Sequence, residues 1–208
     1  VFFNEKFDIG AKLYYFDQLC IHHFEEFNMD VLFVPDEWTN STEKTLKQVR
    51  QKLAERGLEK VDYGIMHGAF DYQLPMVAPA LKHDSQAYLE LVRYLIFIGH
   101  IHTHSRFDRI IVPSSLNRLA QGEEGPKGHV RAKVRSETDY EVIFVENKDA
   151  TIFKTIQCGS LDLQEAYARV DEFIKTIPDG SFIRIRADLG QPILNAQKLM
   201  EERWPTIN

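Results

Sequence analysis

The sequence has few cysteines and no long apolar run. Cys20 and Cys158 are its only cysteines among 208 residues. They lack the spacing of a metal-binding motif, and two thiols in a chain of this length do not indicate a disulfide framework. This usage favours a reducing compartment, so we expect a cytoplasmic protein. Because the longest apolar run is too short to cross a bilayer, we expect no membrane contact.

Positive charge is also in short supply, since the net charge is −6. This balance argues against simple electrostatic wrapping of nucleic acid. It does not exclude a nuclease, because bound divalent cations would invert the local potential. An apolar fraction of 44% and a charged fraction of 27% describe an ordinary globular protein. The chain begins at Val1 with neither an initiator Met nor a signal-peptide pattern, so we expect it to start partway through a domain.

Strands and helices are expected to alternate through about residue 112. Apolar runs predict strands at residues 31–34, 63–67, 94–98 and 109–112. Between them, Asn40 and Glu43 form a capping box that begins a helix ending near Gly57, and a short helix is expected over residues 85–93. This alternation predicts an α/β layered fold.

The pattern changes after residue 128. Successive strands are predicted at residues 130–135, 140–145 and 151–156. A helix capped by Ser160, a strand over residues 182–187 and a final helix opened by Pro192 follow. We therefore expect two domains, a larger one over residues 1–147 and a small α+β domain over residues 148–208.

Two of the predicted strands end in histidine and glycine. The first ends in His67-Gly68, and the apolar run 94–98 leads into Gly99-His100-Ile101-His102. Imidazole is a preferred ligand of zinc, manganese and iron, so His67, His100 and His102 are candidate ligands of a metal site at a sheet edge. The alternative, strongest for His67, is a solvated histidine at a strand end.

Basic residues occupy alternate positions in a later strand. His129, Arg131, Lys133 and Arg135 alternate with apolar residues, which places them on one face. Such a stripe could follow a phosphate backbone, so Arg131, Lys133 and Arg135 are candidate nucleic-acid contacts. The alternative is a solvated strand face opposite a packed one.

These motifs together resemble a known family. They are similar to motifs of calcineurin-like metallophosphoesterases of the SbcD type, which are DNA-repair exonucleases. The similar stretches are the strand-end His-Gly, the Gly-His-Ile-His stretch about thirty residues later, and the segments Pro113-Ser114-Ser115-Leu116-Asn117-Arg118 and Gly122-Glu123-Glu124-Gly125-Pro126-Lys127-Gly128. Ser114 stands where that pattern usually has Gly. The resemblance covers roughly residues 31–128.

The resemblance implies a fold and an activity. It implies the C-terminal half of a metallophosphoesterase layered β-sandwich with flanking helices, followed by an α+β capping domain. By motif position, His67 and His100 would bind one divalent ion and His102 a second, with manganese the expected metal. The complete protein would be a DNA exonuclease or endonuclease subunit of DNA repair or recombination. DNA, a large ATPase subunit of the SbcC type and a second copy of the chain are the implied partners.

Three motifs of that family do not occur in the sequence: an Asp-x-His pair, a Gly-Asp pair and a Gly-Asn-His stretch. The catalytic histidine, the bridging aspartate and the asparagine ligand therefore have no counterparts, and no catalytic residue is assigned here. Three histidines without a carboxylate would form a weak site. Truncation upstream is the simplest explanation, so we expect the 208 residues alone to be inactive. A general phosphodiesterase or phosphatase and a non-catalytic DNA-binding or scaffold protein remain the alternatives.

Overall fold

A computed structural model describes residues 14–75 and 80–207. Their fold is mixed α/β, as predicted, and the chain divides into two compact units between His100 and Ile101. None of the helices in these residues is both long enough and apolar enough to cross a membrane. The elements of the first unit are β1 (Cys20–Phe24), β2 (Met29–Val34), α1 (Thr42–Glu55), β3 (Tyr63–His67), β4 (Ala69–Phe70), β5 (Lys82–His83), α2 (Ser85–Leu91) and β6 (Ile96–Gly99), with a 3₁₀ turn at Glu25–Phe27.

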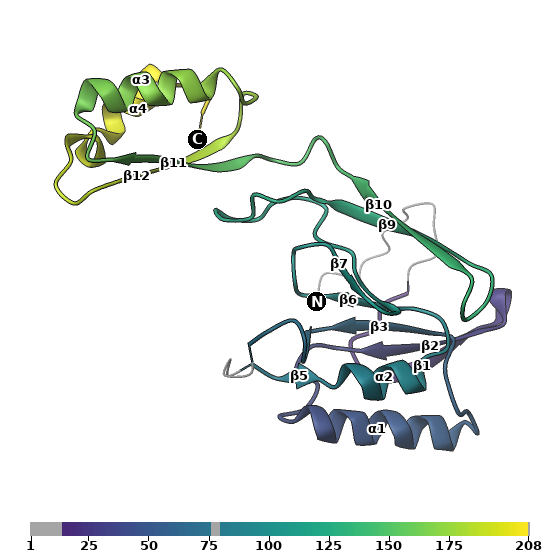
Figure 1. Ribbon diagram of the computed structural model, residues 1–208. Helices are drawn as coiled ribbons and strands as arrows, with labels where there is room; N and C mark the ends of the chain where they lie inside the picture. The colour runs from purple at the N-terminus through teal and green to yellow at the C-terminus, as the bar shows by residue number, and fades with distance from the viewer. Residues whose placement is uncertain (1–13, 76–79, 208) are drawn as a thin grey trace. The chain divides into compact units, whose positions relative to one another are not determined.

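The sheet of the first unit has the strand order β1-β2-β3-β6. β1 pairs antiparallel with β2, whereas β2, β3 and β6 are parallel and lie side by side (Figure 1). Parallel neighbours need a crossover connection, and α1 and α2 supply the two crossovers. The carboxyl ends of β2, β3 and β6 therefore meet at one edge of the sheet.

Helix α1 starts one residue later than the capping box predicted. Ser41 is the N-cap, because its hydroxyl accepts a hydrogen bond from the main-chain N–H of Lys44. The Asn40 side chain accepts from the Lys44 ammonium instead. Both Asn and Ser are good N-caps, so their adjacency made the start ambiguous by one residue. Val49 and Leu53 are buried on one face of the helix.

The second unit contains two hairpins and a crossover unit. Its elements are β7 (Ser105–Phe107), β8 (Ile110–Val112), β9 (Gly128–Val134), β10 (Tyr140–Glu146), β11 (Phe153–Gly159), α3 (Leu163–Ile174), β12 (Phe182–Ala187), a 3₁₀ helix (Pro192–Asn195) and α4 (Gln197–Arg203). β7 pairs antiparallel with β8, and β9 with β10. β11 and β12 are parallel and joined through α3. That connection is of the βαβ type, whereas an α+β arrangement was expected.

The tail of the chain has its own apolar cluster. Ile156, Val170 and Ile193 are buried in it, with Cys158 and Ala166. Asp162 is the N-cap of α3 and forms a reciprocal capping box with Glu165, so the cap is two residues beyond the predicted Ser160. Cys158 is a free thiol, and burial raises its pKa.

The expected domain boundary at residues 147/148 lies inside the second unit and stays a prediction. Side chains from the loop after β8 cross it. Arg118 donates to the carbonyl oxygens of Ala150 and Thr151, and Asn117 bonds to both the main chain and the hydroxyl of Thr151. Asn117 and Arg118 thus fasten the loop after β8 to the start of the tail.

Candidate metal centre and nucleic-acid surface

Three polar side chains follow the ends of the three parallel strands. Asp36 lies two residues beyond β2, His67 is the last residue of β3, and His100 follows β6 directly. The strands are in register at this level, since His67 is paired with Gly99. Ligands of parallel sheets commonly bind at the carboxyl ends of the strands. The topology therefore brings together residues that are 31 and 33 positions apart in the sequence.

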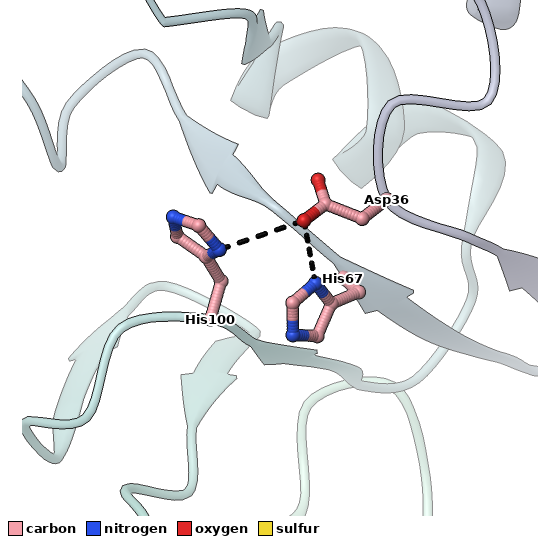
Figure 2. A group of neighbouring side chains, drawn as sticks. All are labelled: Asp36, His67 and His100. Carbon is pink, nitrogen blue, oxygen red and sulfur yellow. Dashed lines mark hydrogen bonds and ion pairs between the residues drawn. The ribbon is translucent and has the colours of Figure 1, made fainter.

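The three side chains converge on one point (Figure 2). His67 Nδ1 donates a hydrogen bond to Asp36 Oδ2 over 2.9 Å, and His100 Nδ1 lies 3.6 Å from the same oxygen. The two imidazole rings are 5.3 Å apart between centroids and nearly perpendicular. All three side chains are between 41% and 51% exposed, so the cluster is open to solvent.

This geometry fits a divalent metal ion. One ligand atom from each residue lies within 4.8 Å of the other two. Ligand atoms held by one ion with bonds of about 2.1 Å lie about 3.0–3.4 Å apart, depending on the coordination angle. Two imidazoles and one carboxylate suit manganese, iron or zinc. Sequence reasoning expected three histidines without a carboxylate, whereas the structure places the carboxylate of Asp36 beside His67 and His100.

Two glycines make room for the cluster. A Cβ on Gly99 would lie 3.0 Å from Cδ2 of His67. A Cβ on Gly68 would lie 3.1 Å from His83 Nε2 and 3.2 Å from Asp36 Oδ1, and Gly68 has φ +120°. A side chain at Gly68 or Gly99 would therefore crowd the residues of the cluster, which explains why glycine suits both positions.

His100 has a strained backbone. Its φ is +107°, in a region that L-residues with side chains rarely adopt. Strain of this kind persists where the surrounding structure over-determines the conformation, and it gathers at functional sites. The unusual backbone conformation thus occurs at the residue whose imidazole lies beside Asp36.

His83 is a neighbour of the cluster. It is buried, makes a hydrogen bond with the main chain of His67, and its pKa is lowered because burial disfavours the imidazolium. His83 also borders a pocket of about 50 Å³ that Asp36, Gly68 and His100 share. Sequence reasoning did not single out His83.

His102 lies in the second unit, where it contacts an acidic residue. Its Nδ1 donates to Glu123 Oε1 over 2.9 Å. The buried ammonium of Lys127 lies 2.8 Å from Glu123 Oε2 and donates to the His102 carbonyl oxygen. Burial opposes ionisation of Glu123, but hydrogen bonds from Lys127, His102 and the main chain of Leu119 outweigh it and lower the pKa of the carboxyl group to about 2. The role of His102 as a second metal ligand stays a prediction.

Ser114 has a backbone conformation that is unusual for serine. Its φ is +81°, a conformation that favours glycine, which is the residue that the pattern usually has here. The Ser114 hydroxyl donates to the His102 carbonyl oxygen over 3.0 Å. That hydrogen bond offsets part of the backbone strain and adds a second hold on His102.

The basic stripe lies on the open face of the β9–β10 hairpin. His129, Arg131 and Lys133 are exposed, whereas Phe144 on the opposite face stacks on His104. Acidic residues lie beside part of the stripe: Arg135 forms a 2.9 Å ion pair with Asp139, and Glu141 is the cross-strand register partner of Lys133.

Arg131 faces Ile143, which is 50% exposed. Because its cross-strand neighbour carries no charge, Arg131 is the residue of the stripe best able to contact a phosphate. The role of Arg131, Lys133 and Arg135 in nucleic-acid binding stays a prediction.

Asp36 is the residue that sequence reasoning missed at the centre of the site. One observation could have indicated it: Asp36 follows Pro35 at the end of the predicted strand 31–34, as His67 and His100 follow theirs. No protein-family model matches the chain, and no curated protein sequence matches it. The functional interpretation therefore depends on the site itself and on the resemblance of its motifs.

Proposed function

We propose that this chain forms part of a metal-dependent phosphoesterase in which Asp36, His67 and His100 hold a divalent ion. The observation that carries the proposal is the convergence of these three side chains at the carboxyl ends of consecutive parallel strands. When bound, a divalent ion there supplies an activated water and a counter-charge for phosphoryl oxygens. Manganese is the metal that we propose, in agreement with the mixed nitrogen and oxygen ligands.

Each residue of the cluster has a distinct task. Asp36 contributes negative charge, which the two neutral imidazoles of His67 and His100 lack. His83 holds the main chain of His67, and Gly68 lets Asp36 and His83 approach each other closely. The half-exposed side chains leave the cluster accessible to a substrate as large as a polymer.

DNA is the substrate that we propose. The resemblance to SbcD-type nucleases supports it, and so does the exposed Arg131 on the open face of the β9–β10 hairpin. In this proposal His102 binds a second ion, and residues outside this sequence supply the remaining ligands and the catalytic histidine. An SbcC-type ATPase and a second copy of the chain are the proposed partners.

Metal binding tests the proposal directly. We expect Mn²⁺ titrated calorimetrically into the 208-residue chain to bind at the cluster of Asp36, His67 and His100, and His67→Ala and His100→Ala to abolish binding at that cluster. His129→Ala is the matched control, because it removes an exposed histidine outside the cluster and leaves binding intact. Circular dichroism checks that each variant is folded. Equal Mn²⁺ affinity in wild type and His67→Ala would contradict the proposed site.

Activity is tested on the protein expressed from the full coding sequence that contains these residues. There we expect His100→Ala to abolish Mn²⁺-dependent DNA hydrolysis without unfolding the protein. Hydrolysis of aryl phosphodiesters but not of DNA would favour a general phosphodiesterase. Full activity of the variant would overturn the assignment of His100, and DNA binding without any hydrolysis by wild type would favour the scaffold alternative.

A further inference from the structure

Glu123 and Lys127 are charged residues of the segment 122–128 that the proposed metal centre does not use. Both contact His102. Glu123 Oε1 accepts a hydrogen bond from Nδ1 of the His102 imidazole over 2.9 Å, and the Lys127 ammonium donates to the main-chain carbonyl oxygen of His102. His102 is thus held through its ring and through its backbone.

Both carboxylate oxygens of Glu123 already have hydrogen-bond partners. Oε1 accepts from His102, whereas Oε2 accepts from the Lys127 ammonium at 2.8 Å and from the main-chain N–H of Leu119 at 3.3 Å. The Lys127 side chain is only 2% exposed, so its charge needs this partner. The carboxylate is therefore fixed in place by groups on both sides.

An ionised carboxylate can only accept hydrogen bonds, so the nitrogen that faces it must carry the proton. The proton of the neutral imidazole then resides on Nδ1, and Nε2 keeps its lone pair. Carboxylates orient metal-binding histidines in this way in many proteins. Within the described residues, Nε2 of His102 makes no hydrogen bond that would use the lone pair.

We infer that Glu123 is a positioning residue that fixes His102 in the Nδ1–H tautomer and presents Nε2 as the ligand atom for a divalent cation. Lys127 anchors Glu123 for this purpose. The inference deepens the proposed function, because His102 is the residue proposed to bind the second ion. It assigns a chemical role to Glu123 and Lys127.

The tautomer can be read without any metal. We would record long-range ¹H–¹⁵N spectra of the histidine rings in the metal-free 208-residue chain at about pH 8.5, two units above the ordinary histidine pKa. The His102 signals are identified by their loss in His102→Gln. We expect the Nδ1–H pattern for His102 in the wild-type chain. An Nε2–H pattern there overturns the inference without any variant.

The variant Glu123→Gln gives a second readout. Lys127 needs an oxygen, so the amide oxygen turns toward it and the amide NH₂ faces His102 Nδ1. We therefore expect His102 to switch to the Nε2–H tautomer while the chain stays folded. Glu124→Gln is the matched control, since Glu124 contacts Lys154 instead and its loss leaves the tautomer unchanged. A tautomer unchanged by Glu123→Gln in a folded chain contradicts the inference.

A metal arm separates this inference from the proposed function. With Mn²⁺ added, we expect paramagnetic broadening of the His102 ring in the wild-type chain and at least tenfold weaker broadening in Glu123→Gln. Broadening that Glu123→Gln does not change counts against the inference. Failure of Mn²⁺ to bind at His67 and His100, with the Nδ1–H tautomer present, would overturn the proposed function and leave the positioning role of Glu123 standing.

Discussion

At the scale of single residues, His100 combines a candidate ligand with an unfavourable backbone conformation. Its φ of +107° would suit glycine, yet the imidazole is the group that meets Asp36. Conformations of this kind cost on the order of 1–3 kcal/mol, and natural proteins retain them where function needs the side chain. His100 is thus a position where stability and ligand binding are expected to oppose each other.

Two variants separate these effects. We expect His100→Gly to unfold with a free energy about 1 kcal/mol higher than that of His100→Ala, because glycine relieves the backbone strain by more than its own chain entropy costs. Both variants are expected to lose Mn²⁺ binding at the cluster with Asp36 and His67. Urea denaturation in the presence of a chelator measures the difference. An alanine variant as stable as the glycine variant would show that the backbone at this residue is relaxed.

At the scale of elements, the β9–β10 hairpin pairs a row of cations with a row of apolar and acidic residues. Arg131 lies opposite Ile143, Lys133 opposite Glu141, and Arg135 bonds to Asp139. The structure therefore makes the three basic residues unequal, although the sequence pattern treats them alike. The free positive charge of the stripe is concentrated near Arg131.

The salt dependence of DNA binding can measure this inequality. If Arg131 contacts a phosphate, Arg131→Ala should lower the slope of log affinity against log salt by about one unit. Arg135→Ala should change the slope by much less, because Asp139 already neutralises that guanidinium. Fluorescence anisotropy of a labelled duplex across a salt series gives both slopes. Identical slopes for wild type and Arg131→Ala would mean that the stripe is an ordinary solvated face.

Helix α4 is fastened to α3 by one carboxylate. Asp171 accepts hydrogen bonds from Arg203 and, over 2.8 Å, from the indole of Trp204. The hydrogen bond from Arg203 is the main cause that lowers the pKa of Asp171 below its ordinary value of 3.8. A depressed pKa in the folded state means that ionised Asp171 stabilises the fold above pH 3.8. This contribution is lost as the pH falls through the lower folded value.

Trp204 fluorescence reports on that contact. In a Trp38→Phe background, Trp204 is the only tryptophan of the chain. We expect its emission to be constant from neutral pH to about pH 4 and to shift to longer wavelength below that. Asp171→Asn should show the shifted emission already at neutral pH, whereas the neighbouring Glu172→Gln should behave like the parent. An unshifted Asp171→Asn spectrum would argue against the carboxylate as the fastening group.

At the scale of the whole molecule, the described residues contain one group of side chains that could hold a metal ion, whereas phosphodiester hydrolysis by enzymes of the proposed class uses two ions. We expect the purified 208-residue chain to hydrolyse DNA or an aryl phosphodiester with little stimulation by Mn²⁺, even where Mn²⁺ binds. The measurement is the rate with and without added Mn²⁺, with His67→Ala as the background. Robust turnover that His67→Ala abolishes would show that Asp36, His67 and His100 are sufficient for catalysis.

The sequence predicted the α/β alternation well, because apolar runs and caps are local. The strand at residues 182–187 was predicted with the bounds that the structure has. The proximity of His67 and His100 could also be anticipated, since both end strands. Asp36 could not be identified with equal ease, because its contact with His67 depends on the parallel pairing of β2 with β3 across 31 residues. The Glu123 contact with His102 likewise spans a loop that shows no periodicity.

The parallel order β2-β3-β6 also has a kinetic consequence. Asp36, His67 and His100 belong to three separate strand ends, so the cluster exists only after two crossovers have closed and both parallel pairs have formed. Pairings between strands far apart in the sequence form slowly, because chain entropy is lost before the contacts compensate for it. If the cluster binds a metal ion as proposed, capture of the ion is a late event during refolding, and it marks the moment at which β2, β3 and β6 have paired.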